Sequence, residues 1–275
     1  MSRGAAVSDL WRLADGVLAS VALAARRVMA IYRTDFAVHQ KQDNSPVTSA
    51  DLAAHTIISE GLATLEPGVP ILSEEGDIPP FEIRAGWQHY WLVDPLDGTR
   101  GFVARSGEFT VNVALISDGE PILGVVAVPI CATSYAAVRG GGARLEHANG
   151  ARQDIHTRRI SAHQVVVLRS RTRRHVDVNR LIAKLGSVRV MRASSSLKAC
   201  LVARGLADVY PAFGPTSQWD TAASQCLIEE AGGALTDRQL NPLRYNRSAS
   251  VENPSFIAVG DPHAGWKKLL AELNS

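Results

Sequence analysis

The sequence predicts an α/β protein whose first half is α+β and whose second half is more regularly α/β. Two helical patterns precede a group of β-branched strands in the first half, whereas short strands alternate with helices after about residue 160. A chain of 275 residues with 46% hydrophobic residues can bury a substantial core, as one large domain or two tightly joined ones. The change of pattern predicts domains at residues 1–158 and 159–275.

The first half begins with two predicted helices. Apolar residues recur at helical spacing between Leu10 and Ile31, and the charges that flank the apolar run 16–25 have the wrong pattern for an exported leader. We therefore expect an amphipathic helix packed on a core there, and no transmembrane span in the chain. A second helix is expected at 52–65, with Ser49 as a candidate N-cap and Asp51 in the first turn.

Strands follow these helices, and helices alternate with strands in the second half. Apolar and β-branched runs predict strands at 69–73, 90–93, 109–117, 122–130 and 135–138, of which the third and fourth pair. In the second half, strands are expected at 165–168, 188–191 and 208–210, and helices at 176–185, 197–203 and 221–231. Strand ends and helix N-termini of an α/β fold converge on the crevice where ligands bind.

Two aspartates lie three residues apart directly after a predicted apolar strand, in the segment Asp94-Pro95-Leu96-Asp97-Gly98-Thr99. Proline holds the chain in a turn, and glycine permits a backbone geometry that a side chain would resist. Two carboxylates in one small volume need a cation or a shared proton to offset their repulsion. The alternative is that both aspartates are ordinary turn formers.

Further acids occur at similar junctions. Glu74 and Glu75 follow one predicted strand, and Asp220 opens a predicted helix. Each has an ordinary explanation, as solvated loop charge for the glutamates and as an N-cap for Asp220. Their recurrence beside the two aspartates favours a shared metal site.

The composition indicates which metal this site would hold. The three cysteines are far apart without a CxxC pair, and the eight histidines lack HxH or HExxH spacing, so zinc and other transition metals have little support. A cluster of carboxylates suits Mg²⁺, which joins acids to substrate phosphates. A net charge of only +2 gives no global field that would gather nucleic acid or anionic lipid. The cysteine pattern also indicates a reducing cytosol.

Two residues near the acids have the chemistry to activate water. Two Mg²⁺ ions would stabilise the attacking and leaving oxygens of a phosphoryl transfer. Thr99 would orient a water molecule while Asp51 accepts its proton. Asp51 also has an ordinary explanation, because an acid in the first turn of a helix interacts favourably with the helix dipole.

The motifs together resemble those of the inositol monophosphatase superfamily of Mg²⁺-dependent, lithium-sensitive phosphatases. The paired segments that carry this resemblance are Asp94–Thr99 and Trp219–Ala223. Segments similar to the CysQ branch, the 3′(2′),5′-bisphosphate nucleotidases, are Asp43–Thr48, Leu72–Glu75, Ser195–Lys198 and Tyr210–Thr216. The similarity runs from the first helix almost to the C-terminus, and it implies a layered αβαβα sandwich.

The resemblance also implies a set of site residues. The implied metal ligands, for two or three Mg²⁺ ions, are Glu74, Asp94, Asp97, Asp220 and the backbone carbonyl of Leu96. Asp51 and Thr99 match the water-activating pair. Substrate-binding residues would be Glu74, Leu96, Asp97, Gly98, Thr99, Ser195, Lys198 and Asp220.

Some features of the sequence leave the identity of the substrate open. Arg100-Gly101 replaces the Lys-Glu pair that usually follows in this branch, and Ser194 replaces a glycine. A second phosphate would need an anion site away from the metals. Lys198 is the first candidate for that site, and the alternative is a cluster of arginines at 169, 171, 173 and 174. The ordinary explanation of this cluster is a group of solvent-exposed charges. Trp219 or Tyr210 would flank an adenine, although such aromatic residues often only pack.

The expected activity is Mg²⁺-dependent removal of the 3′-phosphate from adenosine 3′,5′-bisphosphate, and of its sulfated form as a further substrate, in the recycling of a by-product of sulfate assimilation. The alternatives are an inositol monophosphate or fructose 1,6-bisphosphate phosphatase of the same superfamily, and a non-catalytic Mg²⁺ or nucleotide sensor. We expect a cytoplasmic protein. Peripheral association with the inner face of the cell membrane and assembly into a homodimer stay open.

Overall fold

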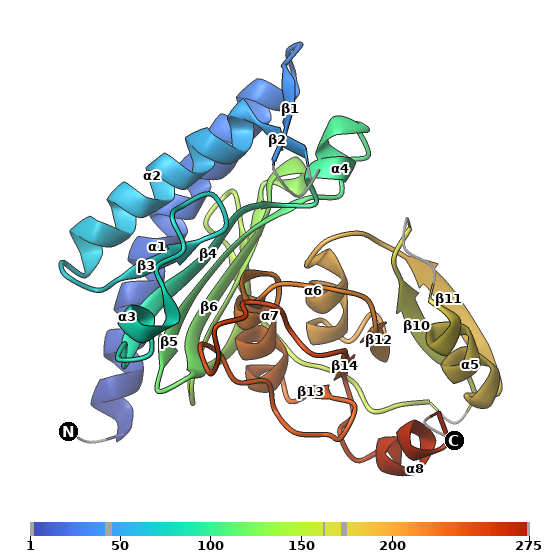
Figure 1. Cartoon of the computed structure of the whole chain (residues 1–275). Helices are drawn as coiled ribbons and strands as arrows, with labels where there is room; N and C mark the ends of the chain where they lie inside the picture. Colours follow the sequence, from blue (N-terminus) through green and yellow to red (C-terminus); the bar gives the residue numbers. More distant parts are fainter. Residues whose placement is uncertain (1–2, 42–45, 162, 172–174, 274–275) are drawn as a thin grey trace.

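The computed structural model describes residues 3–41, 46–161, 163–171 and 175–273. It has five layers in the order α, β, α, β, α, which Figure 1 shows from the side. A seven-stranded sheet and a five-stranded sheet form the two β layers. The prediction of an αβαβα sandwich is confirmed.

The first layer consists of two long helices, α1 (Arg3–Tyr32) and α2 (Ser49–Leu65), which pack on each other and on one face of the seven-stranded sheet. The predicted apolar stripe forms this contact, since Val17 and Val21 of α1 and Ile58 of α2 are fully buried. A short hairpin of β1 (Val38–Gln40) and β2 (Pro46–Thr48) leads from α1 into α2. None of the described helices is both long enough and apolar enough to cross a lipid bilayer.

The second layer is the seven-stranded sheet. Its strands lie side by side in chain order, as β3 (Ile71–Ser73), β4 (His89–Asp97), β5 (Thr110–Ser117), β6 (Glu120–Val128), β7 (Thr133–Val138), β8 (Gly142–His147) and β9 (Arg152–Ile155). β3 is parallel to β4, and the other neighbours are antiparallel. Side chains of β5 alternate between two cores, with Val113 facing the first helix layer and Ala114 facing the third layer.

The third layer holds α6 (Leu197–Ala203) and α7 (Gln218–Glu230) between the two sheets. α7 is buried along most of its length, because it contacts β6 on one side and β13 on the other. Gly124 of β6 permits this close packing, since a Cβ atom there would lie 2.6 Å from the carbonyl oxygen of Ala223. The sequence predicts a helix at 221–231. The observed helix begins three residues earlier, at Gln218.

The fourth and fifth layers come from the second half of the chain. The five-stranded sheet has the order β11 (Val188–Arg192), β10 (Val165–Arg169), β12 (Val209–Ala212), β14 (Phe256–Val259) and β13 (Ala234–Asp237). α5 (Val176–Lys184) and α8 (Trp266–Ala271) cover its outer face. Three short helices complete the fold: α3 (Phe81–Arg84), α4 (Thr99–Val103) and the 3₁₀ helix η1 (Pro129–Cys131).

The structure differs from the sequence predictions in several elements. The N-cap of α2 is Thr48 and not Ser49, because the Thr48 hydroxyl accepts a hydrogen bond from the Ala50 amide. Strands β1, β2, β8, β9, β13 and β14 were not predicted. β9 is largely polar and exposed, so it carries no hydrophobic pattern that distinguishes it from a loop. The domain division at 158 and 159 stays a prediction; the last strand of the first sheet ends at Ile155 and the first strand of the second begins at Val165.

Candidate functional site

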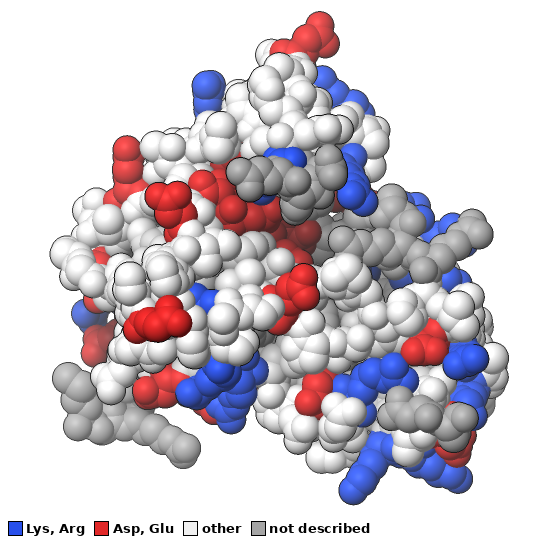
Figure 2. Space-filling view, viewed as in Figure 1, with Lys and Arg blue, Asp and Glu red and all other residues white. Residues whose placement is uncertain are grey.

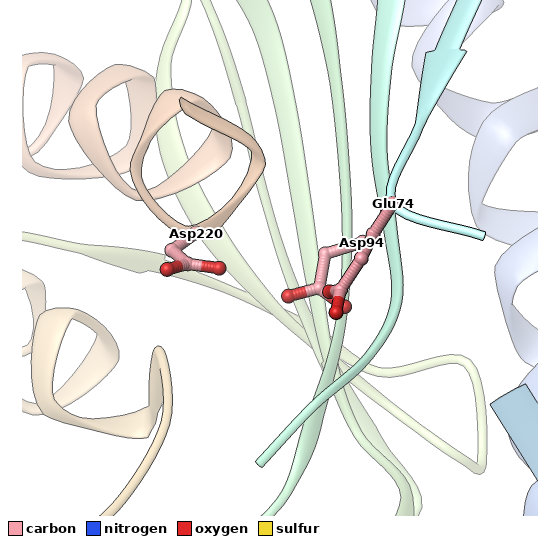
Figure 3. Close-up of side chains that lie close together, drawn as sticks. All are labelled: Glu74, Asp94 and Asp220. Carbon is pink, nitrogen blue, oxygen red and sulfur yellow. The ribbon is translucent and has the colours of Figure 1, made fainter. Parts of the chain in front are cut away.

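Three carboxylates meet where the third layer faces the end of the seven-stranded sheet. Parallel pairing places Ser73 of β3 opposite Val93 of β4, so the next residues, Glu74 and Asp94, are neighbours. Asp220 reaches the same point from the first turn of α7. One oxygen from each of these three acids lies within 4.8 Å of the others, and Figure 3 shows the three side chains converging. The structure thus brings together acids that are far apart in the sequence.

Asp97 joins the same region through an irregularity in β4. Asp94 pairs with Asn112 of β5, but Asp97, three residues later, pairs with Thr110, only two residues earlier along that strand. The extra residue forms a bulge. In a regular strand, side chains three residues apart point to opposite faces of the sheet, but the bulge turns Asp94 and Asp97 to the same face. The predicted turn is therefore a bulged strand end.

Gly98 follows the bulge and is the N-cap residue of α4. Its φ of 95° is in the left-handed region, and a Cβ atom there would lie 3.0 Å from the carbonyl oxygen of Glu108. Both constraints require glycine, as the sequence predicts. The next residue, Thr99, is the first residue of α4 and points its hydroxyl back toward α2.

Asp51 and Thr99 form a hydrogen-bonded pair beside the acids. Thr99 Oγ1 lies 3.0 Å from Asp51 Oδ1 and 3.2 Å from the carbonyl oxygen of Leu96. The other oxygen of Asp51 accepts hydrogen bonds from the Thr48 amide (2.8 Å) and the Thr48 hydroxyl (2.6 Å), which completes a capping box. Burial raises the pKa of Asp51, and the bonds from Thr48 and Thr99 partly oppose this rise. Asp51 therefore caps the N-terminus of α2 with one oxygen and accepts a hydrogen bond from Thr99 with the other.

The cluster is electrostatically unfavourable without a cation. Burial raises the pKa of Asp94 well above its ordinary value, and repulsion from Glu74, Asp97 and Asp220 adds to the rise. Burial, followed by repulsion from Asp97, raises the pKa of Asp220 to about 8. One oxygen of Asp94 is buried without a hydrogen-bond partner among the described residues. These carboxylates fit the oxygen ligands that Mg²⁺ takes.

Lys41 adds a positive charge that sequence reasoning missed. Its ammonium donates to Glu74 Oε1 (2.9 Å) and to Glu75 Oε1 (2.5 Å). Burial lowers the pKa of Lys41, but the attraction of Glu74 and Glu75 outweighs burial and the net pKa is raised. Both glutamates contact Lys41, but among the described residues only Glu74 has an oxygen within 4.8 Å of oxygens of Asp94 and Asp220. The residues 43–45 of the same motif lie outside the described part of the chain.

Ser196 and Asn112 are further site residues that sequence reasoning missed. Ser196 donates its backbone amide (2.6 Å) and its hydroxyl (2.8 Å) to Asp97 Oδ2, and the hydroxyl is also 3.0 Å from the carbonyl oxygen of Asp220. Asn112 of β5 donates to the same hydroxyl at 3.0 Å. Oδ1 of Asp97 makes no hydrogen bond to a described residue. The adjacent Ser195 was predicted as substrate-binding, but nothing in the sequence marks Asn112.

A cavity of about 590 Å³ opens beside the carboxylates. The predicted substrate residues that line it are Glu74, Asp97, Gly98, Thr99, Ser195, Lys198 and Asp220. Leu96 does not line it, since its side chain is buried in the core. Figure 2 shows acidic side chains gathered near the middle of one face of the molecule.

The candidates for a second phosphate site differ in their surroundings. Lys198 lines the cavity, donates to the carbonyl oxygen of Ser195 (2.7 Å) and lies 4.7 Å from the centre of the Tyr210 ring. Arg171 is bound by Glu108 through two contacts of 2.7 Å. Arg169 also lines the cavity, whereas Arg173 and Arg174 lie outside the described residues.

The two aromatic residues that could contact an adenine also have different surroundings. Tyr210 lines the cavity, with its ring beside Lys198. Trp219 is not part of the lining and packs in the core between the layers. Of these two side chains, only Tyr210 is placed to contact a ligand.

Comparison with known proteins identifies close relatives. The family model described as "Inositol monophosphatase family" matches residues 12–274. The chain is 49% identical over 219 residues to the 3′(2′),5′-bisphosphate nucleotidase CysQ of Escherichia coli K12, which covers 80% of this chain and 87% of that protein. It is 37% identical over 248 residues to CysQ of Aggregatibacter actinomycetemcomitans, covering 90% and 92%.

Solved structures agree. The crystal structure of CysQ from Bacteroides thetaiotaomicron, described as a bacterial member of the inositol monophosphatase family, superposes with a TM-score of 0.78 at 35% identity over 90% of this chain and 96% of that chain. The family match covers nearly the whole sequence, and the relatives share both fold and extent. This chain therefore belongs to the inositol monophosphatase family.

Proposed function

We propose that this protein is a Mg²⁺-dependent 3′(2′),5′-bisphosphate nucleotidase that converts adenosine 3′,5′-bisphosphate to AMP and phosphate. The observation that carries the proposal is the buried group of Glu74, Asp94 and Asp220 with a hydrogen-bonded acid and hydroxyl pair beside it. The relatives named CysQ, similar over most of this chain, support the choice of a nucleotide substrate.

The carboxylates of Glu74, Asp94, Asp97 and Asp220, with the carbonyl of Leu96, would hold the Mg²⁺ ions. When bound, Mg²⁺ supplies positive charge that offsets the carboxylates and stabilises the attacking and leaving oxygens. The orphaned oxygen of Asp94 supports this assignment, because a buried carboxylate oxygen without a partner needs one. The number of ions is proposed as two or three.

Asp51 and Thr99 would act on the attacking water. The Thr99 hydroxyl donates to Asp51, so its lone pair can accept a hydrogen bond from water and orient it. Asp51 takes the proton as the water oxygen bonds to phosphorus. The bond from phosphorus to the ribose 3′-oxygen breaks, and that oxygen takes a proton from solvent water to become the 3′-hydroxyl of AMP. The raised pKa of Asp51 makes this carboxylate a stronger base than an ordinary aspartate.

The second phosphate of the substrate is proposed to bind Lys198, whose ammonium lines the cavity beside Ser195 and Tyr210. Tyr210 is proposed to flank the adenine. A cytoplasmic location, peripheral membrane association and a homodimer are further proposals from the sequence.

The decisive experiment compares kcat/KM for three substrates: adenosine 3′,5′-bisphosphate, inositol 1-phosphate and fructose 1,6-bisphosphate. A preference for the nucleotide supports the proposal. A clear preference for either other substrate would assign the chain to another activity of the same superfamily. Failure to release phosphate from any of them with Mg²⁺ present would favour a non-catalytic sensor.

A further inference from the structure

A second cavity, of about 130 Å³, lies at the other end of β4 from the catalytic acids. It is lined by the segment after α3, the turn between β5 and β6, and the segment 245–247. In Figure 1, α3 lies at the end of the sheet remote from α4. The residues that line it are Ala85, Gly86, Trp87, Gln88, Tyr90, Asp118, Gly119, Tyr245, Asn246 and Arg247. None of them lines the catalytic cavity.

Next to this cavity is a buried arginine that has no countercharge among the described residues. Arg84, at the end of α3, is 1% exposed. Its guanidinium donates to the side chain of Asn246 and the carbonyl oxygen of Ala249, and it lies 5.1 Å from the centre of the Phe81 ring. No carboxylate among the described residues forms an ion pair with it, and its Nε has no hydrogen-bond partner among them. A buried charge is normally paired, because removing it from water is costly.

The hydroxyl of Tyr90 is a second hydrogen-bond donor beside this cavity that has no partner among the described residues. This residue lines the cavity and is 1% exposed, and its hydroxyl has no hydrogen-bond partner among the described residues. Burial raises the pKa of Tyr90, while the positive charges of Arg84 and Arg247 oppose the rise. Both guanidinium groups therefore act on this hydroxyl.

Arg247 contributes a second positive charge at the cavity. It donates to the backbone carbonyl of Asp118 at 2.5 Å and forms no ion pair with a described carboxylate. Gly119 leaves room for it, since a Cβ atom there would lie 2.6 Å from the Arg247 guanidinium. Asp118 is the acid among the lining residues, and it is exposed.

We propose that this cavity binds a small oxyanion of the size of sulfate or phosphate. The anion would accept a hydrogen bond from the Tyr90 hydroxyl and contact Arg247, and its charge would offset that of Arg84. A water molecule would satisfy Tyr90 but would leave the charge of Arg84 uncompensated. This site is independent of the catalytic acids and of the proposed activity.

The test uses sulfate as the probe on the full-length protein in the presence of a chelator. Without metal, the carboxylates of the catalytic site repel anions, so sulfate binding there is suppressed. Sodium sulfate is titrated against sodium chloride at equal ionic strength, and Tm is recorded. We expect a saturable rise in Tm with sulfate. Tyr90→Phe and Arg247→Gln should each weaken the apparent affinity about 10-fold, the effect of losing one hydrogen bond to a charged group.

Arg189→Gln is the matched control, because Arg189 is an exposed arginine of β11 and its loss changes the net charge equally. This variant should respond to sulfate like the wild type. A non-saturable rise of equal slope in all four proteins is the general effect of sulfate on protein stability and would overturn the proposal. A saturable response that Tyr90→Phe and Arg247→Gln leave unchanged would also overturn it.

A crystal soaked in selenate provides a direct second measurement. The proposal expects anomalous density between Tyr90 and Arg247, and its absence at a concentration that saturates the Tm response would contradict the assignment. Tyr90→Phe should keep the wild-type kcat/KM with Mg²⁺, because Tyr90 lies away from the catalytic cavity. If the anion site is not found, the proposed enzymatic function is therefore not contradicted.

Discussion

At the scale of single residues, the two oxygens of Asp97 have different surroundings. Oδ2 accepts two hydrogen bonds from Ser196, while Oδ1 bonds to no described residue. Thr110 also donates to Oδ2, at 3.4 Å. An oxygen that already accepts three hydrogen bonds has less capacity for a cation, so we expect Oδ1 to be the metal ligand. Ser196 therefore holds one oxygen of Asp97 and leaves the other available to the proposed metal.

The first prediction concerns the charge of Asp97. Asp97→Asn should lower kcat roughly 10³-fold, because a lost ligand costs several kcal/mol of charge stabilisation. The fold should remain intact by circular dichroism, since the amide has almost the same shape. Glu75→Gln is the control, because Glu75 is not one of the three acids whose oxygens converge and should not be needed for metal binding. Full Mg²⁺-dependent activity of Asp97→Asn would refute the ligand assignment.

The second prediction concerns Ser196. Ser196→Ala removes the hydroxyl that contacts Asp97 and Asn112, and should weaken Mg²⁺ binding about 10-fold, which is typical for residues that orient metal ligands. Calorimetric titration of Mg²⁺ into the substrate-free protein measures this without turnover. Ser187→Ala, at an exposed serine, is the matched control. Unchanged Mg²⁺ affinity of Ser196→Ala would show that the hydroxyl does not position Asp97.

At the scale of elements, α2 connects the proposed base to the strand end that carries the proposed metal ligand Glu74. Asp51 is in its first turn, and one turn later the imidazole of His55 lies 2.8 Å from the hydroxyl of Ser73, the residue before Glu74. Burial lowers the pKa of His55, so the neutral ring is favoured for this hydrogen bond. A displacement of α2 would therefore move Asp51 and the support of Glu74 together.

The third prediction tests the start of α2. Thr48→Ala removes the N-cap hydroxyl and should lower the free energy of unfolding by about 1 kcal/mol, measured in urea. Because Thr48 also donates to Asp51, kcat should fall as well. Ser49→Ala changes the exposed neighbour that the sequence favoured as N-cap, and it should have little effect on either quantity. Equal effects of the two substitutions would contradict the observed cap.

At the scale of the whole molecule, the active site belongs to both halves of the chain. Glu74, Asp94 and Asp97 come from the seven-stranded sheet, whereas Asp220 and Ser196 come from the helices between the sheets. Glu108 adds a contact between the halves, since it binds Arg171 and accepts a hydrogen bond from the Ser194 amide at 3.0 Å. The relative position of the two halves therefore determines the site.

The fourth prediction links metal, pH and folding. In the metal-free protein the pKa of Asp220 is raised from 3.8 to about 8 by burial and by repulsion from Asp97. An acid with a raised folded-state pKa binds its proton more tightly when folded, so its protonation stabilises the fold. That stability is present below the unfolded pKa and is lost as the pH rises toward about 8.

Consequently, Tm in a chelator should fall as the pH rises from about 5 to about 8, and Mg²⁺ should reduce this fall because it replaces the protons. Thermal scans over this range, with and without Mg²⁺, measure both slopes. Asp220→Asn should flatten the metal-free slope, since it removes the titrating group. Parallel pH profiles with and without Mg²⁺ would exclude this linkage.

Elements with a strong hydrophobic pattern were predictable from the sequence. The apolar stripe of α1 and the β-branched runs of β5 and β6 have periodicities that only a helix or a strand explains, and all three are confirmed. Polar β9 and the four-residue strands β13 and β14 are stabilised by pairing with neighbouring strands and lack a pattern of their own. The bulge in β4 was likewise not predictable, because it depends on register with β5.

By itself, the sequence determined the kind of chemistry at the site, since acids at strand ends without histidine or cysteine partners indicate a hard cation. It also indicated Gly98, because a local backbone conformation requires glycine. Only the tertiary structure decided that Glu75 binds Lys41, that Ser196 contacts both Asp97 and Asn112, and that Arg84 is buried with no countercharge in the described part of the chain. These outcomes depend on contacts between segments far apart in the chain, and such distances are set by the packing of the layers and not by any local pattern.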